Sequence, residues 1–192
     1  MKVTRAIGLL MALLVFLIDQ GTKLGVVRAL GVNHDIVKNY LANRLSFDGL
    51  GYEHQVLPIF DLRFVPNVGV SLGMLAADGP LTRWALVAFT AAIAAGVVWW
   101  MLRERKLPDV MLLGMVLGGA MGNILDRSRL GYVVDFADLH FGAWRPFLVF
   151  NVADAGITIG VVILLIRALF VRDKPVVPSD PVPDSVEKNV NA

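Results

Sequence analysis

The sequence predicts an all-α membrane protein with four transmembrane helices, a small β-containing cap on the outer face and a short interfacial helix. Of its 192 residues, 56% are hydrophobic and 18% are charged, and the mean hydropathy is +0.65. Soluble domains carry about 45–50% apolar and roughly 25% charged residues. The excess of hydrophobic residues lies in four apolar stretches, each near the length of about 20 residues that spans a bilayer. We expect spans over residues 6–27, 84–102, 109–125 and 150–170.

The first span begins like a signal peptide. Lys2 and Arg5 precede an apolar run that starts at Ala6. A cleavage site of the A-x-A kind is missing after this run, so we expect the helix to be retained.

The long connection over residues 28–83 predicts the cap. Ile59–Val65, "IFDLRFV", alternates and is rich in β-branched and aromatic residues, which is typical of a strand. Asp35–Leu45 has the pattern of a short amphipathic helix lying at the interface. The residues from 172 to 192 are rich in Pro, Asp, Ser and Lys and predict a disordered cytoplasmic tail, so residues 1–171 form the membrane unit.

Four spans place both termini on one side of the membrane. The second and third spans are joined by the tight basic turn "RERK", Arg103 to Lys106. Concentrated basic residues favour the cytoplasmic side. We therefore expect both termini in the cytoplasm and both long loops on the outer face.

Composition excludes several kinds of site. The chain has no cysteine, which excludes disulfides, thiolate metal ligands and a cysteine nucleophile. Its three histidines form no ligand cluster, so we expect no metal and no cofactor. A formal net charge of +2 is too small to indicate nucleic acid.

Small residues recur in the last two spans. Gly114, Gly118 and Gly122 lie four residues apart in the third, and Gly156 and Gly160 lie in the fourth. Such spacing lets helix backbones approach closely. We expect these glycines to pack the third span against the fourth and bring their outer ends together.

Two carboxylates stand at those outer ends. Asp154 opens the last apolar stretch, and Asp135 lies among apolar neighbours in the connection before it. If they converge in a dry site they cannot easily both ionise, so one pKa rises and the pair shares a proton. Such a pair can activate water and protonate a leaving group, as in aspartic peptidases.

Residue chemistry alone leaves other functions open. A small proton-coupled membrane transporter also uses intramembrane carboxylates, although it needs a polar path through the bilayer. A non-catalytic assembly factor would use them as ties between helices. We expect Asp126 to cap a helix or to pair with Arg127, Asp19 to form a polar tie, and His140 to lie on a loop surface.

Blocks of sequence around these carboxylates resemble the lipoprotein signal peptidases, also called signal peptidase II. The blocks are "IDQGTK", "NVGVSLG", "GGAMGNILDR", "VVDFADLH" and "FNVADAGITIG", in this order between residues 18 and 160. Each block is weak alone, but their order and spacing together are specific. Two departures concern the cap: Val70, Ser71 and Leu72 stand where the family has Ala, Ala and Phe, and the first outer loop is longer than usual.

The resemblance implies an aspartic endopeptidase of the bacterial inner membrane with its active site on the periplasmic side. Its substrates are diacylglyceryl-modified prolipoproteins held among membrane lipids, cleaved just before the lipidated cysteine, and globomycin-type peptides inhibit it. Carried over block by block, the resemblance implies Asp135 and Asp154 as catalytic residues, Asn67, Asn123, Arg127 and Asn151 as substrate-orienting residues, and Asp19, Lys23 and Asp126 as structural polar residues.

Overall fold

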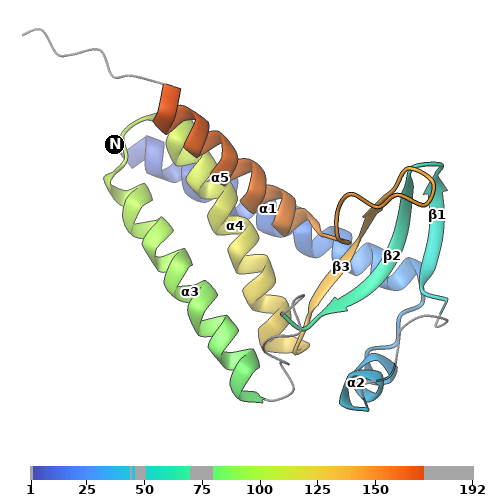
Figure 1. Cartoon of the computed structure of the whole chain (residues 1–192). Helices are drawn as coiled ribbons and strands as arrows, with labels where there is room; N and C mark the ends of the chain where they lie inside the picture. Colours follow the sequence, from blue (N-terminus) through green and yellow to red (C-terminus); the bar gives the residue numbers. More distant parts are fainter. Residues whose placement is uncertain (1, 44, 46–50, 70–79, 171–192) are drawn as a thin grey trace, which may run out of the picture.

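The computed structural model describes residues 2–43, 45, 51–69 and 80–170. Among them are five helices and three strands, shown in Figure 1. The helices are α1 (Lys2–Ala29), α2 (His34–Ala42), α3 (Pro80–Arg103), α4 (Leu107–Arg129) and α5 (Val152–Phe170), and the strands are β1 (Glu53–Leu57), β2 (Phe60–Asn67) and β3 (Val133–Leu139). The sequence-predicted tail over residues 172–192 and most of the "NVGVSLG" block lie outside the described residues.

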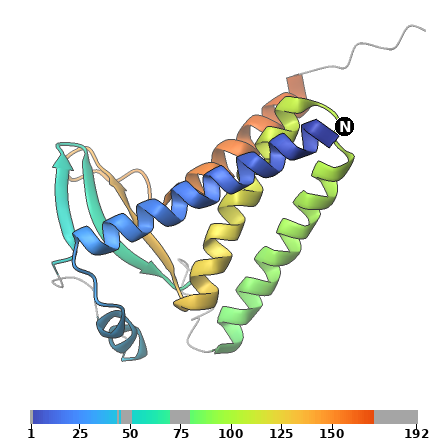
Figure 2. The same cartoon turned by 180° about the vertical axis from the view of Figure 1, so that it is seen from behind.

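Four of the helices are long and apolar enough to cross a membrane, as predicted: α1, α3, α4 and α5. Helix α4 is the central one and contacts the other three, as both views show (Figures 1 and 2). It is also the most buried, whereas α1, α3 and α5 expose leucine, isoleucine and phenylalanine side chains over much of their surfaces. Helices that are apolar all round face lipid or protein interior, so this arrangement is that of a bundle in a bilayer.

The glycines of α4 pack differently from the sequence-based expectation. A Cβ atom added at Gly114 or Gly118 would lie within 2.5 Å of a backbone carbonyl of α1. It is Gly119, outside the four-residue series, that meets α5 in the same way. The expectation was therefore wrong for Gly114 and Gly118, because α1 occupies that face of α4. The predicted contact between the third and fourth spans is nevertheless present, and Gly160 of α5 lies against α4.

The three strands form one antiparallel sheet in the order β1-β2-β3. The predicted strand over Ile59–Val65 corresponds to β2, and β1 lies in the same outer loop, for which strands were expected without bounds. The strand β3 was not predicted. Six of the seven residues of β3 are buried. A strand covered on both faces shows a continuous apolar run instead of alternation. Its period-two signal is therefore missing from the sequence.

Backbone hydrogen bonds join β3 to the start of α5. The N–H of Phe150 donates to the carbonyl of Ala137 at 3.1 Å, and the N–H of Ala137 donates to the carbonyl of Phe150 at 2.8 Å. These bonds bring the residue just before Asn151 against the middle of the strand. The first turn of α5 therefore lies beside Asp135.

Helix α2 covers most of the short amphipathic helix predicted for the first outer loop. Asn33 caps it by accepting hydrogen bonds from the backbone N–H groups of Asp35 and Ile36. Val37 is its buried anchor and packs with the sheet residues around Phe64. Its placement at a membrane interface stays a prediction.

Candidate active site

The first turn of α5 carries Asp154 in a reciprocal cap. The backbone N–H of Asp154 donates to Asn151 Oδ1 at 2.9 Å, and the backbone N–H of Asn151 donates to Asp154 Oδ2 at 3.3 Å. This exchange is the geometry of a capping box. It holds the Asp154 carboxylate at the positive end of the helix dipole, where negative charge is stabilised.

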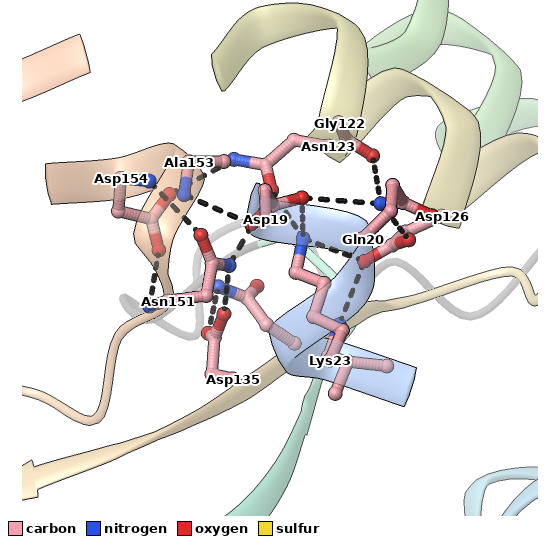
Figure 3. A network of polar contacts seen from close by, with 12 residues as sticks. Asp19, Gln20, Lys23, Gly122, Asn123, Asp126, Asp135, Asn151, Ala153 and Asp154 are labelled. Carbon is pink, nitrogen blue, oxygen red and sulfur yellow. Dashed lines mark hydrogen bonds and ion pairs between the residues drawn. The ribbon is translucent and has the colours of Figure 1, made fainter. Parts of the chain in front are cut away.

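Asp135 lies on β3 next to this helix start. Its cross-strand partner on β2 is Val65, so Asn67 is its diagonal neighbour on the same face of the sheet. Asn67 Nδ2 donates to Asp135 Oδ2 at 2.9 Å, and Asn151 Nδ2 donates to Asp135 Oδ1 at 2.6 Å. Asn151 is therefore bonded to both aspartates, and Figure 3 shows it between them.

The surroundings of Asp135 favour its protonated form. Burial raises the pKa of Asp135 to about 7, and the negative charge of Asp154 adds to the rise. Hydrogen bonds from Asn67 and Asn151 and the charge of Lys23 oppose the rise without cancelling it. Burial dominates because a carboxylate loses its hydration in a low-dielectric site. Near neutral pH the site can hold one carboxylic acid beside one carboxylate, as acid–base catalysis requires.

Asn123 on α4 supplies the remaining contact to Asp154. Its Nδ2 donates to Asp154 Oδ1 at 2.9 Å. Its Oδ1 accepts from Lys23 Nζ at 3.2 Å and lies 3.4 Å from Asn151 Nδ2. Asn123 thus connects α1, α4 and α5 at one point beside the two aspartates.

Lys23 on α1 forms a buried ionic cluster behind these amides. Its Nζ lies 2.9 Å from Asp19 Oδ2 and 2.8 Å from Asp126 Oδ2, and all three side chains are at most 5% exposed. Asp126 therefore pairs with Lys23, whereas the sequence suggested a cap or a pair with Arg127. The reason is again the packing of α1 on α4, which brings the lysine to this carboxylate. Buried charges persist only when paired in this manner.

Asp19 also reaches the first turn of α5. Its Oδ1 accepts the backbone N–H of Ala153 at 2.9 Å, which satisfies one of the unpaired donors of that helix end. Gly122 leaves the necessary room, because a Cβ atom at that position would lie 2.4 Å from Asp19 Oδ2. Asp19 thereby ties α1 to the turn that carries Asp154.

Gln20 belongs to the same cluster and was not singled out from the sequence. Its Nε2 donates to Asp19 Oδ2 at 3.1 Å and to Asp126 Oδ1 at 3.0 Å. The only available signal was its place in the "IDQGTK" block. A neutral amide at a membrane edge has a smaller desolvation cost than a carboxylate, so its presence there is weaker evidence for a functional role.

Arg127 on α4 is half-buried, and its guanidinium interacts electrostatically with Asp135 and Asp154. Within the described part of the chain, its Nε is buried without a hydrogen-bond partner. A cation in this place lowers the energy of negative charge on the two carboxyl groups.

A cavity of about 340 Å³ opens beside Asp135. Asn67 and Asp135 form part of its polar lining, and Leu148 and Val149 form part of its apolar lining. A ligand entering this space can reach the Asp135 carboxyl group while its apolar part contacts the residues that precede α5.

His140 corrects one expectation, since it was predicted on a loop surface. It is 7% exposed, and its Nε2 lies 3.0 Å from Asp61 Oδ2. Its backbone N–H donates to the carbonyl of Ile59 at 3.1 Å, which holds the residue beside the turn between β1 and β2. Over the described ranges, no group of three or more His, Cys, Asp or Glu side chains is arranged to hold a metal ion.

Comparison with known proteins finds one family. The family model described as signal peptidase (SPase) II matches residues 11–170. The lipoprotein signal peptidase of Rhizorhabdus wittichii is 61% identical over 126 residues, which cover 66% of this chain and 73% of that protein. The lipoprotein signal peptidase of Sphingopyxis alaskensis is 47% identical over 167 residues, which cover 87% of each chain.

Solved structures agree with the sequence comparisons. A structure described as a bacterial membrane enzyme, determined by the in meso method at 1.9 Å resolution, superposes with a TM-score of 0.63 at 26% identity. The match covers 85% of this chain and 92% of that one. A second structure of the same description, at 2.3 Å resolution, has a TM-score of 0.61 at 25% identity.

Proposed function

The chain belongs to the lipoprotein signal peptidase (signal peptidase II) family, and we propose that Asp135 and Asp154 are its catalytic pair. Members of this family are aspartic peptidases that cleave signal peptides from prolipoproteins. One observation carries the assignment: Asn151 is hydrogen-bonded to both aspartates. Asp135 lies on a strand 16 positions before Asn151, and Asp154 lies on a helix 3 positions after it. Shared positioning of two carboxyl groups is what water activation between them needs.

The different surroundings of the two aspartates indicate which is the acid and which is the base. Asp135 carries the proton at rest, because burial raises its pKa to about 7. Asp154 is the carboxylate, because its charge faces the N-terminus of α5. Asp154 takes a proton from water while the water oxygen attacks the scissile carbonyl carbon, and Asp135 gives its proton to the carbonyl oxygen. The tetrahedral diol then collapses: Asp135 recovers a proton from one hydroxyl group, Asp154 protonates the leaving nitrogen, and the C–N bond breaks.

Three further side chains orient this pair in our proposal. Asn67 and Asn123 each donate to one of the two carboxyl groups and so fix their directions. Arg127 stabilises the negative charge that passes between them during the reaction. Asn151 sets their separation, while Asp19, Lys23 and Asp126 hold α1, α4 and α5 together behind the site.

We propose diacylglyceryl-modified prolipoproteins as the substrates, cleaved just before the lipidated cysteine, with residues 1–171 as the peptidase unit of a multi-pass protein of the bacterial inner membrane. Both termini would lie in the cytoplasm and the site on the periplasmic side. The acyl chains of such a substrate stay in the bilayer, so its scissile bond lies near the membrane surface. Asp154 stands at the end of α5 that meets the sheet, and Asp135 lies beside it on β3, where this bond would be. Globomycin-type peptides are the inhibitors that this assignment implies.

The decisive experiment compares wild type with Asp135→Asn and Asp154→Asn in detergent. Each variant keeps the size of the side chain but removes its ability to exchange a proton in this cycle. A diacylglyceryl-modified prolipoprotein is the substrate, and release of the signal peptide is followed by gel shift. We expect both variants to lose at least about a thousandfold in kcat.

Asp35→Asn is the matched control, because Asp35 is exposed on α2. It should cleave like wild type. Thermal unfolding of all four proteins separates loss of catalysis from loss of fold. Near-normal cleavage by a folded Asp135→Asn or Asp154→Asn variant would remove that residue from the catalytic pair.

A further inference from the structure

Seven large, exposed apolar side chains lie on the hairpin of β1 and β2 and on the loop that follows β3. Their exposed fractions lie between 45% and 74%. We call this set the apolar tip: Val56, Leu57, Ile59, Phe141, Trp144, Phe147 and Leu148.

Two loops are held together to form the apolar tip. The turn between β1 and β2 carries Ile59, whose carbonyl accepts the N–H of His140 just beyond β3. In the second loop, Phe141 and Trp144 exchange backbone hydrogen bonds at 2.8 and 3.2 Å, and their ring centroids are 5.7 Å apart. The apolar side chains are thus presented by a defined backbone.

The exposure of the tip is selective. Elsewhere in the cap, Phe64, Tyr132 and Val134 are at most 4% exposed in one cluster, so this fold does bury large side chains. Contiguous exposed apolar patches of this kind mark interaction surfaces for proteins or membranes.

The position of the tip favours the membrane. In both views the sheet extends sideways from the start of α5, and its tip lies on the side away from α2 (Figures 1 and 2). The second loop, residues 141–149, leads within three residues into the membrane helix α5. It also carries Trp144 beside Arg145, which pairs with the buried Asp138. Tryptophan and arginine are residues that lie at the boundary between acyl chains and headgroups.

We propose that the apolar tip inserts into the bilayer leaflet that borders the sheet and anchors the cap there. Leu148 belongs both to the tip and to the wall of the cavity beside Asp135. Insertion therefore sets the height of Asp135 relative to the lipid surface, and it turns one wall of the cavity toward acyl chains. The anchoring does not depend on the catalytic assignment.

The test uses Trp144 as its own probe in vesicles. Trp84, Trp99 and Trp100 are replaced by Phe, and the protein is reconstituted in phosphatidylcholine brominated at successive acyl positions. Bromine should quench Trp144 fluorescence, most strongly from positions near the headgroup. Iodide in the water should quench it several-fold less than it quenches a single tryptophan at Lys38→Trp, an exposed position on α2.

Iodide quenching equal to that of the α2 probe, without bromine quenching, would overturn the proposal. Shielding from both quenchers, together with a doubled particle mass, would mean that the tip contacts a second copy of the chain. That result would also overturn the proposal. A second variant guards against an isolated effect of Trp144: Leu57→Asp, in the other loop, should at least halve the bromine quenching. Ile36→Asp, at an exposed apolar position on α2, should leave it unchanged, whereas an unchanged signal in Leu57→Asp would contradict joint insertion of the two loops.

Discussion

Asp135 and Asp154 have identical side chains in different surroundings. Asp135 is 2% exposed on a strand that is covered on both faces. Asp154 is half-buried and accepts a backbone N–H at the start of a helix. A neutral carboxylic acid tolerates the first place, and a carboxylate is stabilised in the second. The asymmetry that the proposed reaction needs is therefore present before any substrate binds.

The rate of cleavage should fall as the pH rises through about 7. In the proposed cycle Asp135 must hold a proton at the start, and its pKa is raised to about 7. Above that value, kcat/KM should fall about tenfold per pH unit. Initial rates on a lipid-modified prolipoprotein between pH 6 and 9 measure this limb. A flat profile over this range, with the protein folded throughout, would assign the resting proton to another group.

The stability of the protein should depend on pH through the same group. The pKa of Asp135 is about 7 in the folded protein and 3.8 as a model value, so between these pH values the folded state binds the extra proton. Stability from protonated Asp135 is therefore complete below about pH 3.8 and is lost as the pH rises through about 7. Asp135→Asn does not titrate.

The difference in melting temperature between Asp135→Asn and wild type should thus grow in favour of the variant from pH 5 to pH 8. Thermal unfolding in detergent at several pH values measures it. The exposed Asp35→Asn variant should show no such trend. A constant difference for Asp135→Asn would mean that Asp135 does not change its protonation in this window.

At the scale of the elements, α4 positions the site through close contacts with its neighbours. Gly118 faces the carbonyl of Ala12 on α1, and Gly119 faces the carbonyl of Ala153 on α5. Without side chains at these points, the three helices approach closely enough for Lys23 to reach Asn123. Small residues at helix contacts have this effect in membranes, where apolar surface alone gives no preference for protein over lipid.

Gly118→Ala should destabilise the protein. The added Cβ atom would lie 2.4 Å from the Ala12 carbonyl oxygen and 2.9 Å from Val15 Cβ, so α1 must shift away from α4. Overpacking of this kind costs about 1–3 kcal/mol. The melting temperature in detergent measures the loss.

Gly96→Ala on α3 is the matched control for this change. A Cβ atom at Gly96 meets nothing within 4 Å, so the melting temperature should stay the same or rise. Equal effects of the two substitutions would show that helix propensity, and not the α1–α4 contact, governs the response.

At the scale of the whole molecule, four membrane helices support a cap built from two distant parts of the chain. Strands β1 and β2 come from the connection after α1, while β3 comes from the connection after α4. The sheet joins them, and the bonds between Ala137 and Phe150 attach it to α5. The site forms where this sheet meets the ends of α1, α4 and α5.

This arrangement predicts opposite labelling of the two ends of the bundle. The chain has no cysteine, so single cysteines report position without background. A membrane-impermeant maleimide should label Lys38→Cys, on α2, in intact spheroplasts. It should label Arg105→Cys, in the turn between α3 and α4, only after lysis. The reverse pattern would place the termini outside and overturn the proposed orientation.

The membrane class, the four spans and the aspartates at the ends of apolar runs could be predicted from the sequence. Long apolar runs are local properties that need no partner, and an aspartate at their edge is visible because its desolvation is costly. The resemblance in sequence blocks was needed to predict roles for three amides, because an amide has no such local signature. These are Asn67, Asn123 and Asn151. The strand β2 could be predicted from its alternation of apolar and polar residues, a pattern that a strand keeps when one of its faces is exposed.

Which polar groups meet could not be predicted from the sequence and depends on the packing of distant segments. Asp126 pairs with Lys23 because α1, far away in sequence, packs on α4. The strand β3 and the burial of His140 depend on layers that cover them from other parts of the chain. The apolar tip likewise exists because the sheet brings two loops together. Pairing and burial arise from contacts between distant segments, and such contacts leave no periodic trace in either segment alone.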